Sequence, residues 1–462
     1  MSSFFQKVKL LFANSFLRNL AINLFLGLLV VSGMLYFSDS LWLMEAEDAS
    51  MDWLMQVNQN TILPIHENNI PPVVMLDVDD KTYYDWGRPL FTPRKPLKNM
   101  IEVAVEAKAR LIIVDLDVSQ RTHVEGSQLH LDDQILKDYL KGYIAKCKEK
   151  NRDKTACPPI ILRRALNTRS SSSVPTLWSS FLDDVVTHDA APYVQWASRQ
   201  FYPAADGVVR RWKLWQLTCA SDNQLEVIPS VELLVMGFVK EECVIQDVQN
   251  TLHFLLKKYD NSCVPQQLSE TVNFCGWTIN RKDRRGINNQ RITYRISWAN
   301  LVLDEAKNPV LTVLPAQPYT EPPLQESTEA LTDSIVILGK SYSEGYDIYS
   351  TSLKDMPGTL IIVNAIYSLL QPEKIELPIG IRLFINVLFI GFISIFFNEF
   401  FSYGGIIVLS ILTIFILLPL TMIFFHGGVW FNLALPLIGL VFIRVIVKYQ
   451  VYLTKKLYLR FK

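Results

Sequence analysis

VVMLDVDD at residues 73–80 and RLIIVDLDV at residues 110–118 are two short runs, apolar almost throughout and closed by aspartates. Runs of this length that are apolar at every position predict strands buried on both faces of a sheet. Between them, residues 96–108 carry apolar side chains at helical spacing, which predicts a helix. A strand–helix–strand unit implies parallel strands joined by a right-handed crossover, so we expect the two strands to be neighbours in one sheet.

Outward from this unit, helical and extended patterns alternate along the chain. We expect helices at 45–56, 129–148, 229–238 and 358–370, strands at 159–166 and 334–338, extended segments over 193–217 around a turn at 205–207, and a loop at 315–329. Helices and buried strands mixed in this way predict an α/β domain, a mixed sheet flanked by helices.

Apolar runs long enough to cross a membrane lie at both ends of the chain. Residues 20–37, 379–397, 406–425 and 429–447 each provide the length that a transmembrane helix needs. A cleaved signal peptide is the alternative for the first run, although its apolar region would be shorter and would end in small residues. A buried helical core is the alternative for the other three, but it needs a surrounding shell of chain. We therefore expect four transmembrane helices.

The orientation follows from cations that flank these runs, because short loops rich in lysine and arginine stay in the cytoplasm. The flanking cations are Lys7, Lys9, Arg18, Lys448, Lys455, Lys456, Arg460 and Lys462. The expected organisation is 1–19, an amphipathic cytoplasmic N-terminus; 20–38, the first transmembrane helix; 39–378, an extracytoplasmic domain; 379–447, three transmembrane helices; and 448–462, a short basic cytoplasmic tail. The tail alternates aromatic and basic residues, so anionic lipid or a cytoplasmic protein is its expected partner.

All six cysteines lie in the segment expected outside the membrane, which favours disulfides. They are Cys147, Cys157, Cys219, Cys243, Cys263 and Cys275. Six cysteines allow 15 connectivities. Short loops favour Cys147 with Cys157 and Cys243 with Cys263, which leaves Cys219 and Cys275. A zinc site is the rival reading, but no C-x-x-C or paired histidine spacing supports it.

The composition and the motifs argue against several other functions. Lysine plus arginine and aspartate plus glutamate each number 45, so no nucleic acid partner is expected. Residues 337–341 resemble the end of a phosphate-binding loop, but the first glycine of that motif is missing. H-E-x-x-H and G-x-S-x-G do not occur, so we expect neither an enzyme nor a cofactor.

Four stretches of the middle segment carry a resemblance to a known family. They are VVMLDVDD at 73–80, WGRPLFTPR with LIIVDLDV at 86–118, ADGVVRRWKL followed by PSVEL at 205–233, and IVILGKSYSEGYDIYST through MPGTLIIVNAIYSLL at 335–370. In this order they resemble the type-two CHASE domain, an extracytoplasmic sensory module of bacterial cyclases and kinases. The resemblance implies a multi-pass protein of the bacterial inner membrane with its large domain in the periplasm. Family members usually continue into a cytoplasmic catalytic domain, whereas only about 15 residues follow the last apolar run here, too few for a folded domain.

Acidic side chains follow the predicted strands, where open α/β sheets bind ligands. They are Asp77 and Asp79 after the first strand, Asp115 and Asp117 after the second, and Asp347 after the strand at 334–338. Each pair is spaced by two residues, so both carboxylates should point the same way.

Two interpretations of these acids remain open. Asp79, Arg94, Asp115 and Asp347 match positions of the family motifs, which makes them candidate ligand-binding residues. One interpretation is a polar sensing pocket, with Asp77, Asp79, Asp115 and Asp117 as carboxylate ligands of a divalent cation. The other is structural: Arg94 and backbone N–H groups satisfy the acids and hold the loops.

Two classes of function fit this sequence. In the first, a receptor subunit detects a ligand or an envelope partner and signals through a separate effector, because no output domain is expected in the same chain. In the second, the domain is a structural scaffold of a cell-envelope complex. A homodimer is compatible with both.

Overall fold

The computed structural model describes the middle of the chain most fully. The described residues are 40–59, 70–122, 129–149, 157–167, 175–219, 225–239, 289–322 and 326–370, with short pieces between 271 and 287, at 375–376, 418–426 and 429–430, and isolated positions within 25–36 and at 384. Two compact units can be distinguished, Asn58–Gln371 and a second one formed by Met1–Val57 with Pro372–Lys462.

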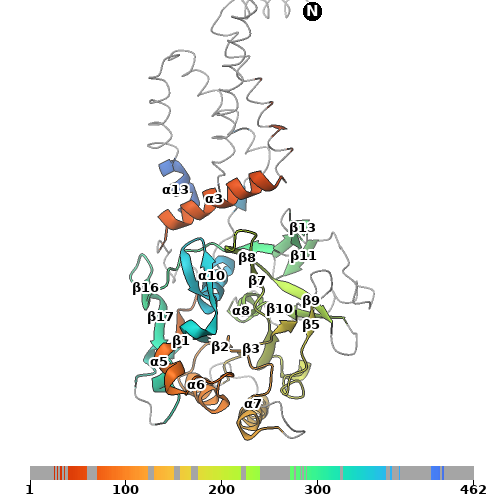
Figure 1. Cartoon of the computed structure of the whole chain (residues 1–462), viewed down its shortest axis with the longest axis vertical. Helices are drawn as coiled ribbons and strands as arrows, with labels where there is room; N and C mark the ends of the chain where they lie inside the picture. The colour runs from red at the N-terminus through yellow and green to blue at the C-terminus, as the bar shows by residue number, and fades with distance from the viewer. Residues whose placement is uncertain are drawn as a thin grey trace, which may run out of the picture. The chain divides into compact units, whose positions relative to one another are not determined.

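A seven-stranded mixed sheet forms the centre of the larger unit (Figure 1). In spatial order its strands are β16 (Leu301–Leu303), β17 (Pro309–Pro315), β1 (Val73–Val78), β18 (Ile335–Lys340), β2 (Leu111–Val114), β3 (Ile160–Arg163) and β6 (Val194–Ala197). All neighbours pair in parallel except β16 and β17, which are antiparallel. The expected mixed α/β fold is confirmed.

The prediction that the first two strands are neighbours is wrong. β18 lies between β1 and β2 and pairs in parallel with both. It comes from more than 200 residues further along the chain, so local patterns could not indicate that it inserts there. The second strand is also shorter than predicted and ends at Val114, although Asp115 still donates its N–H to the carbonyl of Leu338 (2.9 Å).

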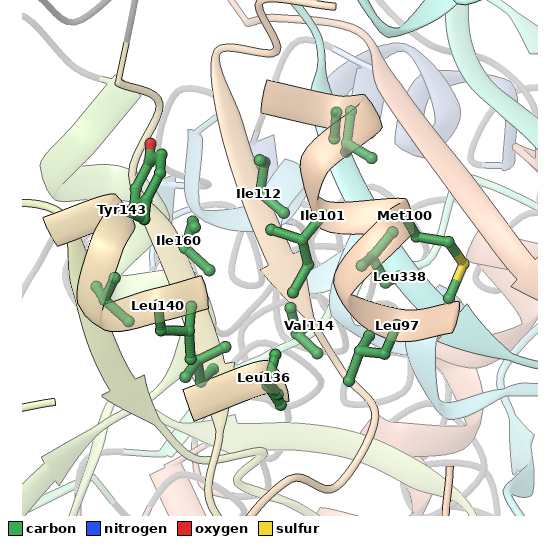
Figure 2. Packing of buried hydrophobic residues seen from close by; sticks show 14 of the residues in the cluster. Leu97, Met100, Ile101, Ile112, Val114, Leu136, Leu140, Tyr143, Ile160 and Leu338 are labelled. Carbon is green, nitrogen blue, oxygen red and sulfur yellow. The ribbon is translucent and has the colours of Figure 1, made fainter. Parts of the chain in front are cut away.

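One face of the sheet is covered by α6 (Arg94–Glu106) and α7 (Leu131–Glu149), and the contacts between them form a continuous apolar core. The helices contribute Leu97, Met100, Ile101, Leu136, Leu140 and Tyr143, and the strands contribute Ile112, Val114, Ile160 and Leu338 (Figure 2). Such side chains stabilise the fold by about 1.5–3 kcal/mol each when fully buried. The alternate strand residues necessarily face the opposite side.

On that opposite side, α8 (Val231–Val239) and α10 (Gly358–Leu370) pack against each other and against the sheet. Both helices are buried along nearly their whole length, which explains their almost purely apolar sequences. α10 is the last helix of the larger unit, ending one residue before its boundary at Gln371.

Smaller sheets and helices complete the described part. A four-stranded sheet contains β10 (Leu225–Pro229), β9 (Trp215–Cys219), β5 (Thr176–Leu177) and β4 (Leu166–Asn167), and a five-stranded sheet contains β15 (Asn289–Arg291), β8 (Val209–Lys213), β19 (Ile348–Thr351), β20 (Lys354–Pro357) and β7 (Phe201–Pro203). Short hairpins join β11 (Thr271–Phe274) with β12 (Trp277–Asn280), and β13 (Lys282–Asp283) with β14 (Gly286–Ile287). The short helix α5 (Asp80–Asp85) follows β1.

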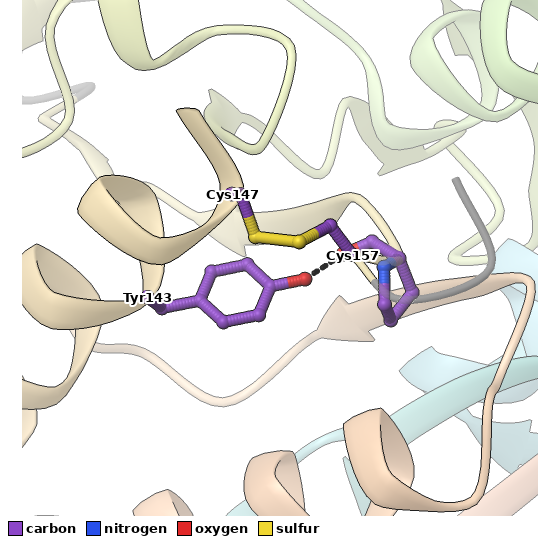
Figure 3. The surroundings of a disulfide bond; sticks show 4 residues. Tyr143, Cys147 and Cys157 are labelled. Atoms are coloured by element: carbon purple, nitrogen blue, oxygen red, sulfur yellow. Dashed lines mark hydrogen bonds between the residues drawn. A yellow bond between two sulfur atoms is a disulfide. The ribbon is translucent and has the colours of Figure 1, made fainter. Parts of the chain in front are cut away.

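A disulfide joins Cys147 at the end of α7 to Cys157 just before β3 (Figure 3). The hydroxyl of Tyr143, one turn earlier, donates a hydrogen bond to the carbonyl of Pro158 (2.6 Å). Both contacts hold the end of α7 against the start of β3. The disulfide confirms the predicted pairing of Cys147 with Cys157. Cys219 is also disulfide-bonded. The predicted pairing of Cys243 with Cys263 lies outside the described residues, as does Cys275.

In the smaller unit, the described elements are α3 (Leu41–Val57), β21 (Ile375–Glu376), α13 (Leu418–His426) and β22 (Val429–Trp430). Among the described residues, no helix combines the length and apolar character needed to cross a membrane. The four predicted spans fall mostly outside the described residues, so they stay predictions.

Candidate functional site

Three polar residues and a glycine form a row across the carboxyl ends of four neighbouring strands. Asp77 of β1 lies opposite Gly339 of β18. Leu338 of β18 pairs with Val114 of β2, so the next residues, Gly339 and Asp115, lie side by side. Val114 also pairs with Leu162 of β3, so Arg163 lies beside Asp115 in the same way. All four point to the face covered by α8 and α10, because they alternate with core residues such as Leu338.

Asp115 is the centre of this row and is fully buried. Its Oδ2 accepts a hydrogen bond from the hydroxyl of Thr359 (2.7 Å), the second residue of α10. Arg163 donates to the backbone carbonyl of Asp115 (2.9 Å) and approaches its Oδ1 (3.5 Å). Nη1 of Arg199, which follows β6, lies 3.9 Å from Oδ2. One carboxylate therefore joins three strands to the start of a helix.

Gly339 makes room for the contact between α10 and the sheet. A Cβ atom at this position would lie 2.4 Å from Oγ1 and 2.5 Å from Cγ2 of Thr359. Any larger residue would displace the helix start and with it the hydroxyl that bonds Asp115. The glycine that resembled part of a phosphate-binding loop thus has a packing role.

Arg199 carries the network onward to Asp347. Its Nη1 lies 2.7 Å from Oδ1 of Asp347, and its Nη2 donates to the hydroxyl of Tyr349 on β19 (2.8 Å). The guanidinium also lies over the rings of Phe201 and Tyr349, at 4.9 and 5.3 Å from their centroids. The carbonyl of Asp347 accepts the N–H of Gly358, the first residue of α10 (2.8 Å). Asp115 and Asp347 therefore both hold the N-terminal turn of α10.

We call Asp115, Arg163, Arg199, Asp347 and Thr359 the edge cluster. Burial raises the pKa of Asp115, although Arg163 and Arg199 oppose the rise. Burial also disfavours the charge on Arg199, but Asp115 and Asp347 outweigh this effect and raise its pKa. Two carboxylates and two guanidinium groups thus form a compact network in which each charge depends on the others.

Two of the other candidate acids serve the loops beside this cluster. The side chain of Asp79 accepts from the N–H of Thr82 (2.8 Å) and caps the N-terminus of α5. Asp77 accepts from the hydroxyl of Ser341 (2.5 Å) through one oxygen, and burial raises its pKa to about 6. Asp79 is one residue past the end of β1, where the backbone is still extended, and its charge adds to the rise in the pKa of Asp77.

Arg94 belongs to a separate buried group on the α6 and α7 face. Its Nε pairs with Oδ1 of Asp133 on α7 (3.2 Å), and both side chains are 0% exposed. Its remaining donors reach the carbonyls of Asp117 (3.2 Å) and Gln120 (2.7 Å). Arg94 therefore ties the loop after β2 to α7.

Comparison with known proteins assigns the chain to a family. The family model of the CHASE2 domain matches residues 26–396. The chain belongs to the CHASE2 family. No curated protein and no solved structure was found to be similar to it. CHASE2 domains are typically extracytoplasmic sensory domains, so the general role of this domain is sensory.

Within this CHASE2 domain, the structure brings together only some of the predicted site residues. Asp115 and Asp347 share the edge cluster through Arg199, whereas Asp79 and Arg94 lie in other contacts. Asp117 accepts from the N–H of Ser119 (2.9 Å). Among the described residues, no three acidic, histidine or cysteine side chains are grouped so that they could hold a metal ion. Of the four acids suggested as cation ligands, no three are grouped in this way.

The sequence interpretation missed the basic members of the edge cluster and the buried Glu232. Arg163 is the first of two adjacent arginines at the end of β3, and Arg199 follows β6, whose sequence VQWA is not apolar throughout. The signal that was present is their position, at or just past the carboxyl end of a strand, where the acids were predicted to gather. The hydroxyl of Thr359 gave no such signal, because threonine at the start of a helix is common.

Proposed function

We propose that this CHASE2 protein is a non-catalytic receptor subunit of the bacterial inner membrane. In this proposal its domain lies in the periplasm, both termini are cytoplasmic, and it passes its signal to a separate cytoplasmic effector. The observation that supports the proposal best is the edge cluster, which connects the carboxyl ends of the central strands to the first turn of α10. Ligands of open α/β sheets bind at this edge.

The position of α10 gives the cluster a route for transmission. The helix begins at the cluster with Gly358 and Thr359, and it ends at Leu370, shortly before the apolar run predicted to start at residue 379. A change in the bonds of Asp115 or Asp347 would alter the start of a rigid element that precedes the predicted membrane segment in the sequence. Buried networks suit such a switch, because they repack between discrete arrangements.

Affinity purification of the full-length chain in a mild detergent tests this function. We expect a cytoplasmic kinase or cyclase to co-purify with the wild-type protein. We also expect the activity of that enzyme to change with Asp115→Asn, which keeps the shape of the side chain and removes its charge. Asp85→Asn, at the exposed end of α5, is the matched control and should behave as the wild type.

A different result would favour the scaffold. If only envelope or outer-membrane components co-purify, and Asp115→Asn changes neither their identity nor their amount, the receptor function is refuted. The domain would then be a structural subunit in which the edge cluster serves stability alone.

A further inference from the structure

Glu232 is a buried carboxylate that lies outside the pairs described so far. It is the second residue of α8 and is 1% exposed. Neither of its carboxylate oxygens has a hydrogen-bond partner within the described part of the chain. Helix capping does not use it, because the hydroxyl oxygen of Ser230 accepts the N–H of Leu233 (3.2 Å). An acid in this position requires a physical explanation.

The charged groups around Glu232 come from the edge cluster. α8 packs against β2, β3 and α10. Asp115 follows β2, Arg163 ends β3, and Arg199 follows β6. Of these, Asp115 and Arg199 act electrostatically on Glu232. α10 contains no charged residue, and on β10, which leads into α8, the one charged residue is the exposed Glu226.

Glu232 is the acid near this cluster that has no ion pair. Arg163 and Arg199 pair with Asp115 and Asp347, and Lys340 at the end of β18 also interacts with both of these acids. Among the described residues, none of these cations bonds to either carboxylate oxygen of Glu232. An ionised carboxylate without hydrogen bonds is much less stable in such a place than the neutral acid. Burial raises the pKa of Glu232 to about 7, and Asp115 adds to the rise, whereas the nearby backbone N–H of Glu232 itself, the side chain of Ser230 and the charge of Arg199 oppose it to a lesser degree.

We infer that Glu232 is a proton-binding site whose charge controls the edge cluster, so that the signal detected by this domain is the pH outside the membrane. The role as a signal rests on the proposed receptor function, whereas proton binding does not. When Glu232 releases its proton to solvent, the new negative charge competes with Asp115 and Asp347 for Arg199. The carbonyl of Asp347 holds the N–H of Gly358, so this competition loosens the first turn of α10.

Hydrogen exchange of the full-length protein in lipid nanodiscs measures this linkage. Glu232→Gln is close in shape and stays neutral, so it should keep the protonated arrangement at every pH. The quantity to compare is the protection of the slowest amides of α10 in the wild type, divided by their protection in E232Q. This ratio should fall about 30-fold from about pH 5.5 to about pH 8.5, for a pKa of Glu232 near 7 in the folded state and an ordinary pKa in the unfolded state. Glu226→Gln removes an exposed carboxylate of the same type on β10 and should follow the wild type.

A second measurement detects the protonated carboxyl group itself. The infrared carbonyl signal of protonated carboxylic acids in the wild type should contain a component that disappears with a midpoint near pH 7, and Asp77→Asn should retain it. The inference is overturned if this component is absent, or if E232Q and the wild type show the same pH dependence of protection. Neither readout involves an effector. Failure to capture an effector, with the titration intact, would refute the receptor function and leave the proton site standing.

Discussion

Replacing Asp133 by alanine tests whether Arg94 is a structural residue or a free ligand-binding group. The change leaves a fully buried guanidinium without its carboxylate partner. Removing one member of a buried ion pair costs about 3–5 kcal/mol, mostly because the remaining charge stays desolvated. The N–H and hydroxyl of Thr122 also lose Asp133 as an acceptor (2.9 and 3.1 Å). We therefore expect the free energy of unfolding to fall by about 4 kcal/mol.

Pulse proteolysis of the full-length protein across a urea series in detergent gives this free energy. The matched control is Lys137→Ala on the same helix, which removes a surface ion pair between partly exposed Lys137 and exposed Asp184 (2.8 Å) and should cost less than about 1 kcal/mol. The double variant Arg94→Met with Asp133→Leu should regain at least about 2 kcal/mol of the loss, because no unpaired charge remains.

One outcome would refute this reasoning. If Asp133→Ala costs less than about 1 kcal/mol with an unchanged urea dependence, Arg94 does not depend on the pair and is free to bind another group. If the cost is as expected, Arg94 holds the loop after β2 against α7, and its match to the family motif reflects stability.

Three further predictions use the same urea measurement. Replacing Cys147 and Cys157 by alanine should lower the free energy of unfolding by about 3 kcal/mol, since the bond closes a loop with a sequence separation of 10; no loss under oxidising conditions would show that the bond does not constrain the unfolded chain. Gly339→Ala should cost about 1–3 kcal/mol, because the added Cβ clashes with Thr359 of α10. Gly142→Ala should stabilise α7 by up to about 1 kcal/mol, because its Cβ would meet nothing within 4 Å. Equal effects of the two variants would contradict the packing role of Gly339. Because the pKa of Asp77 is raised to about 6, the folded state binds a proton at Asp77 more tightly than the unfolded state does. The stabilisation from this proton is complete below about pH 4 and is lost as the pH rises through 6. Asp77→Asn should remove up to about 3 kcal/mol of this pH dependence of the free energy of unfolding, and an unchanged pH profile would refute the prediction.

Several features of this protein were determined by the sequence itself. A strand buried on both faces needs apolar side chains at almost every position, so β1, β2 and β18 were visible as nearly continuous apolar runs. The pairing of Cys147 with Cys157 was predictable because the short separation favours it. The motif order identified the family, and the acids at the strand ends indicated the edge at which Asp115 and Asp347 meet.

Only the tertiary structure decided which side chains meet. β18 inserts between β1 and β2, and that insertion places Gly339 beside Asp115 and lets Thr359 reach it. The partners of Arg94, Arg199 and Glu232 depend in the same way on helices and strands far apart in the chain. Periodicity reports whether a residue is buried, because burial repeats with the local geometry of a helix or strand. It carries no information about which buried neighbour comes from a segment 200 residues away, and for a charged side chain that neighbour sets both its pKa and its role.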